Sequence, residues 1–345
     1  MKALVKTAPA PGHVEYLDWP DPHPGPSEVL IAVKRAGVCG TDLSVYDWNR
    51  LIAEGYNPTL PVVMGHEFAG VVLEVGREAV GLHYGDHVIV NPALTCGHCR
   101  FCRSEQSMLC GDRRLVGLQA PGVFAEYVVA PADNVYRVPA ELPWDLAAVA
   151  EPFAVALHAI EKLAISPGST VALVGPGSIG FCLLAALKLT PAARIVMVGL
   201  EADRERLEMA ARMGASVAVI GSESLKQAVL DVTDGLGADV CFETAGHPQA
   251  IAVATDLTRK GGRIGLLGLP HDLTSVNTAS LALTEKQLIG IRAYDVTTWR
   301  RVAPLLERAS GDLERVVTHR VPMREFEHAV ELTRSRQGLK VLLMP

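Results

Sequence analysis

The chain has 345 residues, of which 49% are hydrophobic and 20% charged, and its 32 Lys and Arg against 38 Asp and Glu give a net charge of −6. This length permits a large hydrophobic core and favours two domains. No segment gathers Lys and Arg as a phosphate-tracking surface would, so we expect no nucleic-acid partner. The first twelve residues lack the apolar core of a secretion signal, and no apolar run approaches the ~18 residues of a membrane span. We therefore expect a cytoplasmic protein with no membrane contact.

The sequence of residues 1–150 predicts a β-rich domain. Short β-rich runs such as EVLIAVKRAG (28–37) and EFAGVVLEVG (67–76) alternate with Gly and Pro turns. This pattern is typical of an all-β, partly open barrel.

The pattern changes near residue 151. Segment 147–163 carries apolar residues at helical spacing, and from Thr170 short apolar strands alternate with amphipathic helices. Such alternation predicts a doubly wound parallel sheet over residues 151–294, and so an α/β fold class. Helical patterns at 297–310 and 324–335, together with a closing strand, follow this region. We expect 295–345 to return to the first domain.

Four of the seven cysteines fall within fifteen positions: Cys96, Cys99, Cys102 and Cys110. An odd cysteine count and a reducing cytosol argue against a disulfide framework. Turn residues mark this segment as a loop, which disfavours a helix-borne redox pair. Short Cys-x-x-Cys steps suit one tetrahedral ion, and four sulfurs leave no position for a substrate. We predict a structural zinc, and an iron–sulfur cluster remains an alternative on ligand type.

A glycine motif, GPGSIG, lies directly between a predicted strand and a predicted helix, with Gly175, Gly177 and Gly180 in G-x-G-x-x-G spacing. The first glycine permits a tight turn, the second lets the backbone approach a pyrophosphate, and the third lets the helix pack on the strand. The helix N-terminus favours the phosphate charge. This context predicts dinucleotide binding. Further residues expected to line the same site are Ser178, Ile179, Ala245, Leu267 and Gly268.

The next predicted strand bears on the choice between NAD and NADP. An Asp or Glu at its end would bind the adenosine ribose of NAD, but that place falls on Gly199. Glu201 follows two positions later, and Arg204 and Arg206 lie just beyond. An arginine would favour the 2′-phosphate of NADP, whereas a nearby glutamate would repel it. The choice stays open, with Glu201 favouring NAD.

Two further stretches suggest a second metal site. GVCGTD offers Cys39 and Thr41, and VMGHEFAG offers His66 and Glu67. Zinc held by three protein ligands keeps a fourth position for an alcohol and lowers the pKa of that alcohol. Cys39 alone is more typical of a buried small hydrophobe, and His66 alone of a core histidine. Together, beside a dinucleotide motif, they predict a catalytic zinc.

These motifs together resemble the zinc-dependent medium-chain dehydrogenases, in the branch that contains sorbitol and other polyol dehydrogenases and threonine dehydrogenase. The resemblance covers essentially the whole chain, through GVCGTDLSVYDW, MGHEFAGVV, the four-cysteine loop, AEPFAVALHA, GPGSIG and ETAG. It implies a GroES-like catalytic domain, a Rossmann domain, zinc, NAD or NADP, and a homodimer or homotetramer.

The resemblance also implies roles for single residues. Cys39 and His66 match catalytic zinc ligands, and either Glu67 or Glu151 matches a further ligand. Alternatively, Glu151 caps the helix that follows Pro152. Thr41 matches the hydroxyl that hydrogen-bonds the reacting oxygen and begins the proton relay.

Departures from the family pattern limit the assignment. Ser44 stands where many relatives have a histidine, so protons would leave through Ser44, water or Glu151. Ala93 stands where threonine dehydrogenases have a histidine, although their Tyr-Asp-Trp is present and begins at Tyr46. The segment GIRAYDVTTW resembles one that contacts polyol hydroxyls. The substrate candidates are Tyr46, Arg292 and Tyr294. Arginine at 292 could equally bind a cofactor phosphate.

The sequence therefore predicts an enzyme that oxidises a secondary alcohol of a polyol, sugar alcohol or cyclitol to a ketone, with NAD(P)⁺ accepting the hydride. Two rival interpretations stay open. One is oxidation of an amino alcohol such as threonine, which Ala93 disfavours. The other is a zinc-stabilised binding protein that has lost activity, which would have no chemical reason to keep Cys39, Thr41, His66 and Glu151 together.

Overall fold

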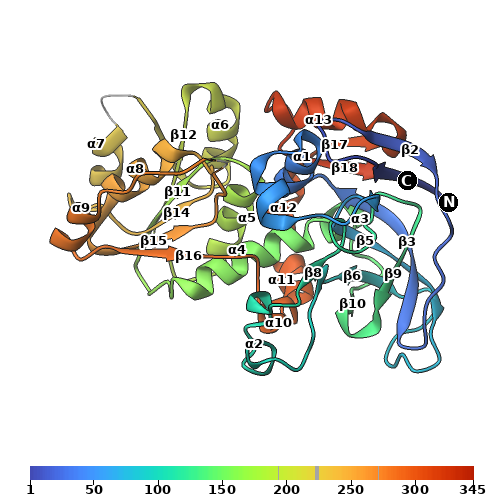
Figure 1. The fold of residues 1–345 in the computed structure, drawn as a ribbon. Helices are drawn as coiled ribbons and strands as arrows, with labels where there is room; N and C mark the ends of the chain where they lie inside the picture. The colour runs from blue at the N-terminus through green and yellow to red at the C-terminus, as the bar shows by residue number, and fades with distance from the viewer. Residues whose placement is uncertain (193, 222–224, 271) are drawn as a thin grey trace. The chain divides into compact units, whose positions relative to one another are not determined.

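The computed structural model describes residues 1–345 except 193, 222–224 and 271. The chain forms two compact units, Met1–Pro152 with Asp295–Pro345, and Phe153–Tyr294 (Figure 1). The sequence predicted this boundary between residues 150 and 151, and in the structure it lies two positions later, after Pro152.

The first unit is built on a seven-stranded sheet with strand order β10-β6-β5-β3-β18-β17, in which β9 also pairs with β3. The strands are β3 (Glu28–Gly37), β5 (Glu67–Val75), β6 (His87–Val90), β9 (Tyr127–Pro131), β10 (Val135–Arg137), β17 (Val317–Pro322) and β18 (Lys340–Met344). Because β18 pairs antiparallel with β3, the C-terminal tail joins the first unit. Apolar side chains such as Ile31, Phe68 and Phe124 form the core.

Smaller elements complete this unit. One sheet joins β1 (Lys2–Lys6), β2 (Val14–Asp18) and β4 (Val62–Val63), and another joins β7 (Ala93–Leu94) and β8 (Arg114–Leu115). The short helices are α1 (Gly40–Asp47), a π-helical turn (Leu51–Tyr56), α2 (Arg100–Arg103) and α3 (Trp144–Ala147). The longer α4 (Ala150–Lys162) begins here and continues into the second unit.

The C-terminal segment differs from the predicted pattern. The sequence suggested one helix over 297–310, whereas the structure has α10 (Val296–Trp299), α11 (Val302–Arg308) and α12 (Ser310–Leu313). Pro304 is the third residue of α11 and has no N–H to donate to the carbonyl of Arg300, so the break between α10 and α11 falls just before it, at residues 300–301. The later helix α13 (Phe326–Arg334) packs on β17 and β18.

The second unit is a six-stranded parallel sheet with the order β13-β12-β11-β14-β15-β16. Its strands are β11 (Thr170–Val174), β12 (Arg194–Gly199), β13 (Ser216–Val219), β14 (Ala238–Glu243), β15 (Thr258–Leu266) and β16 (Gln287–Gly290). The chain runs outward from β11 to β13 and then returns to β14 beside β11. The predicted doubly wound sheet is confirmed, with its topological switch point between β11 and β14.

Helices connect the strands of this sheet (Figure 1). They are α5 (Ser178–Leu187), α6 (Arg204–Arg212), α7 (Leu225–Asp231), α8 (Pro248–Leu257) and α9 (Thr278–Leu283). Residues 180–187 of α5 are all buried, because this helix packs on β11 and β12. The third glycine of the predicted motif is needed here: a Cβ on Gly180 would lie 2.2 Å from the carbonyl oxygen of Gly175.

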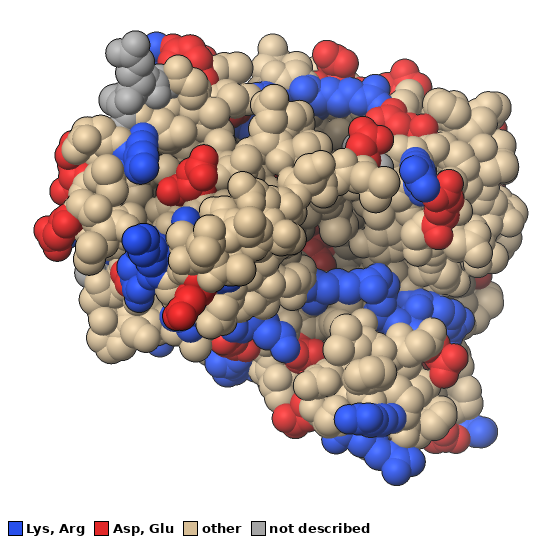
Figure 2. All heavy atoms as spheres, turned by 60° about the vertical axis from the view of Figure 1, so that its left-hand side comes forward, with Lys and Arg blue, Asp and Glu red and all other residues tan. Residues whose placement is uncertain are grey.

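Charged side chains of both signs occur across the face drawn in Figure 2, where blue Lys and Arg lie among red Asp and Glu. Among the described residues, no helix is both long enough and apolar enough to cross a bilayer.

Candidate zinc and dinucleotide sites

The four-cysteine loop brings its sulfur atoms together. Cys96 Sγ lies 3.6 Å from Cys110 Sγ and 3.9 Å from Cys102 Sγ, and Cys99 Sγ lies 3.5 Å from Cys102 Sγ. Sulfurs ~2.3 Å from one tetrahedral ion would stand ~3.8 Å apart, so these separations fit a single zinc. The cysteines are unpaired thiols in the structure, not disulfides.

Backbone amides support the same arrangement. The N–H of Cys99 donates to Cys96 Sγ at 3.4 Å, and the N–H of Cys102 donates to Cys99 Sγ at 3.5 Å. Hydrogen bonds from the backbone of His98 and Cys99 lower the pKa of Cys96 to about 6. Such amide donors stabilise thiolates, which are the form that binds metal. The loop is therefore chemically fit for a metal with four thiolate ligands.

The second predicted metal site lies where β3, β5 and α1 meet. Ligand atoms of Cys39, His66 and Glu67 all lie within 4.8 Å of one another. Cys39 follows β3 and precedes α1, and Glu67 is the first residue of β5. His66 is 4% exposed and Glu67 1% exposed. A soft thiolate, an imidazole and a carboxylate at this spacing are a donor set that suits zinc.

Asp42 supports this group and was not singled out in the sequence. Its Oδ2 accepts the N–H of Cys39 at 2.8 Å, and its Oδ1 lies 3.8 Å from His66 Nδ1. Burial raises the pKa of Asp42 to about 6. A carboxylate behind a ligating histidine commonly orients the imidazole ring. A sequence signal for this role was available, because Asp42 follows Cys39 by three residues and lies in the first turn of α1.

Lys340 contacts the same group from the other end of the chain. Its Nζ donates to Glu67 Oε2 at 2.6 Å, to Glu67 Oε1 at 2.9 Å and to the carbonyl oxygen of Val38 at 3.1 Å. Both carboxylate oxygens of Glu67 are thus engaged by a buried ammonium. No local sequence pattern links residues so distant along the chain.

The remaining predicted catalytic residues lie around this centre. Thr41 Oγ1 is 3.8 Å from Cys39 Sγ, and Ser44 is 7% exposed on the same helix, α1. Glu151, in the first turn of α4, is 9% exposed. Burial lowers the pKa of His66, but the Cys39 hydrogen bond and the charges of Asp42, Cys39 and Glu151 raise it well above its usual value overall. The negative surroundings favour a cation at this site.

The glycine turn of the second unit has the geometry that dinucleotide binding requires. Gly175 begins the turn after β11 with φ +110°, which favours glycine. Gly177 caps the N-terminus of α5, and a Cβ there would meet nothing within 4 Å, so its backbone faces open space. A pyrophosphate would find free amide donors at this helix end.

The cofactor-selecting residues lie beside that turn. β12 ends at Gly199, where a Cβ would lie 2.9 Å from Pro176 Cγ in the glycine turn. Glu201 is 64% exposed and forms an ion pair with Arg204. Arg206 Nη1 donates to the carbonyl oxygen of Pro176 at 3.4 Å. The predicted arginine is thus brought to the phosphate-binding turn, whereas Glu201 faces solvent with a cationic partner.

The three substrate candidates differ in their contacts and in their exposure to solvent. The Tyr46 hydroxyl lies 3.5 Å from Glu327 Oε1, and its ring packs near Phe326, so this side chain contacts α13. Tyr294 is 1% exposed and Arg292 is exposed. Substrate binding by Tyr46, Arg292 and Tyr294 stays a prediction.

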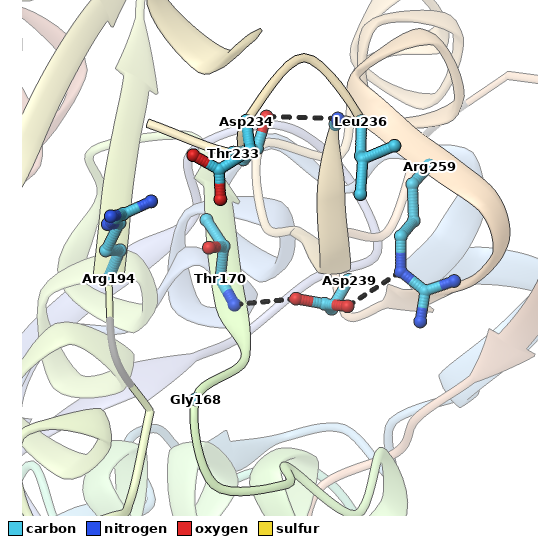
Figure 3. A pocket seen from close by; sticks show the side chains of 9 residues that line it. Gly168, Thr170, Arg194, Thr233, Asp234, Leu236, Asp239 and Arg259 are labelled. Atoms are coloured by element: carbon cyan, nitrogen blue, oxygen red, sulfur yellow. Dashed lines mark hydrogen bonds and ion pairs between the residues drawn. The ribbon is translucent and has the colours of Figure 1, made fainter. Parts of the chain in front are cut away.

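A surface cavity of about 280 Å³ lies elsewhere on the second unit (Figure 3). Its lining includes Thr170, Arg194 and Asp239, which stand at or near the amino ends of their strands. Ligands of doubly wound sheets bind at the carboxyl ends. This cavity is therefore separate from the glycine turn.

Two family models match the chain. The model of the alcohol dehydrogenase GroES-like domain matches residues 25–140, and the model of the zinc-binding dehydrogenases matches residues 178–308. An L-threonine 3-dehydrogenase from Bacillus licheniformis is 36% identical over 100% of this chain and 99% of its own length. The chain belongs to the zinc-dependent medium-chain alcohol dehydrogenase family.

Other members of the family extend the comparison. A sorbitol dehydrogenase from Halalkalibacterium halodurans is 35% identical over 100% of this chain and 99% of its own length. The crystal structure of galactitol-1-phosphate dehydrogenase from Escherichia coli aligns with a TM-score of 0.89 and 27% identity, covering 100% of both chains. The family establishes an enzyme with a GroES-like domain and a Rossmann domain that uses zinc and NAD or NADP.

Proposed function

We propose that the enzyme oxidises a secondary alcohol of a polyol, sugar alcohol or cyclitol to the ketone, with NAD⁺ or NADP⁺ accepting the hydride. The observation that carries this proposal is the group of half-buried Cys39 with buried His66 and Glu67, whose ligand atoms lie within 4.8 Å of one another. Zinc bound there would supply Lewis acidity that lowers the pKa of an alcohol.

We further propose that Cys39 and His66 are zinc ligands and that Glu151 supplies the third protein ligand. Glu67 lies closer within the group, but both its oxygens accept hydrogen bonds from Lys340. In this proposal Glu67 lies beside the metal as the partner of Lys340 and is not a ligand. Thr41 would accept the hydrogen bond of the substrate hydroxyl, and Ser44, further along α1, would take part in moving the proton away.

Oxidation of an amino alcohol is the second candidate. The identity with the L-threonine 3-dehydrogenase of Bacillus licheniformis favours it. Position 93 counts against it, because Ala93 is 4% exposed and offers only a methyl group where the threonine branch is expected to have histidine.

The test is NAD(P)H formation from a panel of polyols, sugar alcohols and cyclitols against L-threonine, with His66→Ala as the inactive control. A higher kcat/KM on the polyol group supports the proposal. A higher kcat/KM on threonine would replace it with the second candidate, and no turnover of any alcohol would contradict both.

We also propose a homo-oligomer in a reducing compartment such as the cytoplasm. β16 is an edge strand of the second unit's sheet, and nearby Leu283 is 85% exposed, as expected of a surface that a second copy covers. All seven cysteines are thiols and not disulfides, which is compatible with a reducing compartment. Sedimentation velocity would test the assembly, and a monomer at micromolar concentration would contradict it.

A further inference from the structure

Glu243 is a fully buried carboxyl group at the switch point of the parallel sheet. It is the last residue of β14 and is 0% exposed. Its register partner is Val174, the last residue of β11, which directly precedes the glycine turn. Burying a carboxyl group is costly unless its oxygens accept hydrogen bonds. The hydrogen-bond partners of Glu243 therefore show how this buried carboxyl group is stabilised.

The residue binds the backbone of two turns at once. Glu243 Oε1 accepts the N–H groups of Ala245 at 2.7 Å and Gly246 at 2.8 Å, in the turn after β14. Its carbonyl oxygen accepts the N–H groups of Leu267 at 2.9 Å and Gly268 at 3.0 Å, in the turn after β15. One residue thus connects two turns at the carboxyl end of the sheet.

The two turns touch each other over this carboxyl group. A Cβ on Gly268 would lie 2.2 Å from the nitrogen of Gly246 and 2.5 Å from Glu243 Oε2, so only glycine fits at 268. Gly246 has φ +65°, and a Cβ there would lie 2.9 Å from the nitrogen of Leu269. Burial raises the pKa of Glu243. The separation of the turns therefore depends on this side chain and these glycines.

The following residue extends the connection to the phosphate-binding turn. The Thr244 hydroxyl donates a hydrogen bond that is shared between the carbonyl oxygens of Val174, at 3.0 Å, and Gly175, at 2.9 Å. Segment 243–246 therefore contacts the glycine turn on one side and the turn after β15 on the other.

In a doubly wound sheet, each half binds one mononucleotide of the cofactor. The glycine turn belongs to the half formed by β11, β12 and β13, so the turns after β14 and β15 belong to the nicotinamide half. We propose that Glu243 is a positioning residue that sets the separation of these two turns and thereby the affinity for the nicotinamide end. This inference rests on the use of NAD(P) in the proposed function.

The test compares Glu243→Ala and Glu243→Gln with Asp239→Asn. Asp239 lies on the same strand at its other end, where it accepts the N–H of Thr170 at 2.8 Å and pairs with Arg259 at 2.7 Å (Figure 3). It is therefore a matched control for the loss of a carboxylate from β14. Binding of NADH, NADPH and ADP-ribose, which lacks nicotinamide, is measured by fluorescence and calorimetric titration of the full-length enzyme.

We expect Glu243→Ala to weaken binding of NADH or NADPH by about tenfold or more and binding of ADP-ribose by less than about threefold, since two buried hydrogen bonds are lost. Glu243→Gln keeps an oxygen acceptor and should retain most of the wild-type affinity for NADH or NADPH. Asp239→Asn should leave the affinity for both ligands near that of the wild type. The cofactor KM should rise in Glu243→Ala more than kcat falls.

Equal losses of ADP-ribose and NADH affinity in Glu243→Ala, or no loss of either, would overturn the positioning role. If Glu243→Ala does not fold, Gly268→Ala tests the same contact from the facing turn, with the same expected pattern and the same contradicting outcome. A wild-type enzyme that binds neither NADH nor NADPH would contradict the proposed function itself, which is a separate result.

Discussion

Lys340 Nζ lies 2.6 Å from Glu67 Oε2, and both side chains are 1% exposed. The pair joins β18, near the C-terminus, to the start of β5, beside the candidate zinc ligands Cys39 and His66. The ammonium also donates to the carbonyl oxygen of Val38. A buried charge with several partners is stable only while those partners remain, so this pair links the fold of the tail to the electrostatics of the site.

Lys340→Met should leave the Glu67 carboxylate buried without its cation. We expect the free energy of unfolding to fall by about 3–5 kcal/mol, the typical cost of removing one partner of a buried pair. Urea denaturation measures this change in the free energy of unfolding. The double variant Lys340→Met/Glu67→Gln should recover part of the loss because no charge is left unpaired. Arg50→Ala, which breaks the exposed Arg50–Glu54 pair, is the control and should cost less than about 1 kcal/mol. A Lys340→Met protein as stable as the wild type would contradict the account.

Cys102→Ser should remove the metal of the four-cysteine loop while leaving the Cys39 site loaded. A structural zinc holds the loop in shape, so the variant should lose one zinc per chain and unfold at a lower temperature. Elemental analysis and calorimetry measure both effects. Cys182→Ala, a buried cysteine outside the loop, should keep the wild-type zinc content. The structural assignment would fail if Cys102→Ser were fully stable and inactive.

Cofactor preference should depend on Arg206. The sequence favoured NAD on account of Glu201, but this side chain is 64% exposed and paired with Arg204, whereas Arg206 contacts the glycine turn. We therefore expect NADP to be used at least as well as NAD. Arg206→Ala should lower kcat/KM for NADP about tenfold more than for NAD, since a charge-assisted contact to phosphate is lost. Arg212→Ala, at the far end of α6, is the control. A wild-type preference for NAD that Arg206→Ala leaves unchanged would refute this expectation.

His158 should make the protein less stable in mild acid. Burial, with a smaller contribution from Lys162, lowers the pKa of His158 from 6.5 to about 4. The unfolded chain therefore takes up this proton at a higher pH than the folded chain does. The folded state loses stability as the pH falls from about 6.5 to about 4, by about 2 kcal/mol at about pH 5. Urea unfolding at about pH 7.5 and about pH 5 should show a smaller difference in His158→Gln than in the wild type. The exposed His328→Gln is the control, and an unchanged difference in His158→Gln would count against the explanation.

Local patterns in the sequence predicted much of the fold and of the metal chemistry. The glycine spacing at Gly175 and the Cys-x-x-Cys steps at Cys96 are short-range signals, because one turn or one loop supplies all the geometry. Relationships across the chain left no such signal. Lys340 was read only as part of a closing strand, and the contacts of Asp42 with His66 and of Glu243 with the turn after β15 join residues that are distant in the sequence. The broken helix at 297–310 shows the opposite case, in which a proline inside an amphipathic pattern was given too little weight.

The most direct measurement of the central claim is a combined assay of zinc content, NAD(P)H binding and turnover on His66→Ala. The account predicts two zinc ions per chain in the wild type and one in the variant, no alcohol oxidation by the variant, and NAD(P)H affinity within about threefold of the wild type, because the glycine turn lies in the other unit. Retained turnover in His66→Ala, or a loss of NAD(P)H affinity along with activity, would contradict the assignment of a catalytic zinc to Cys39 and His66.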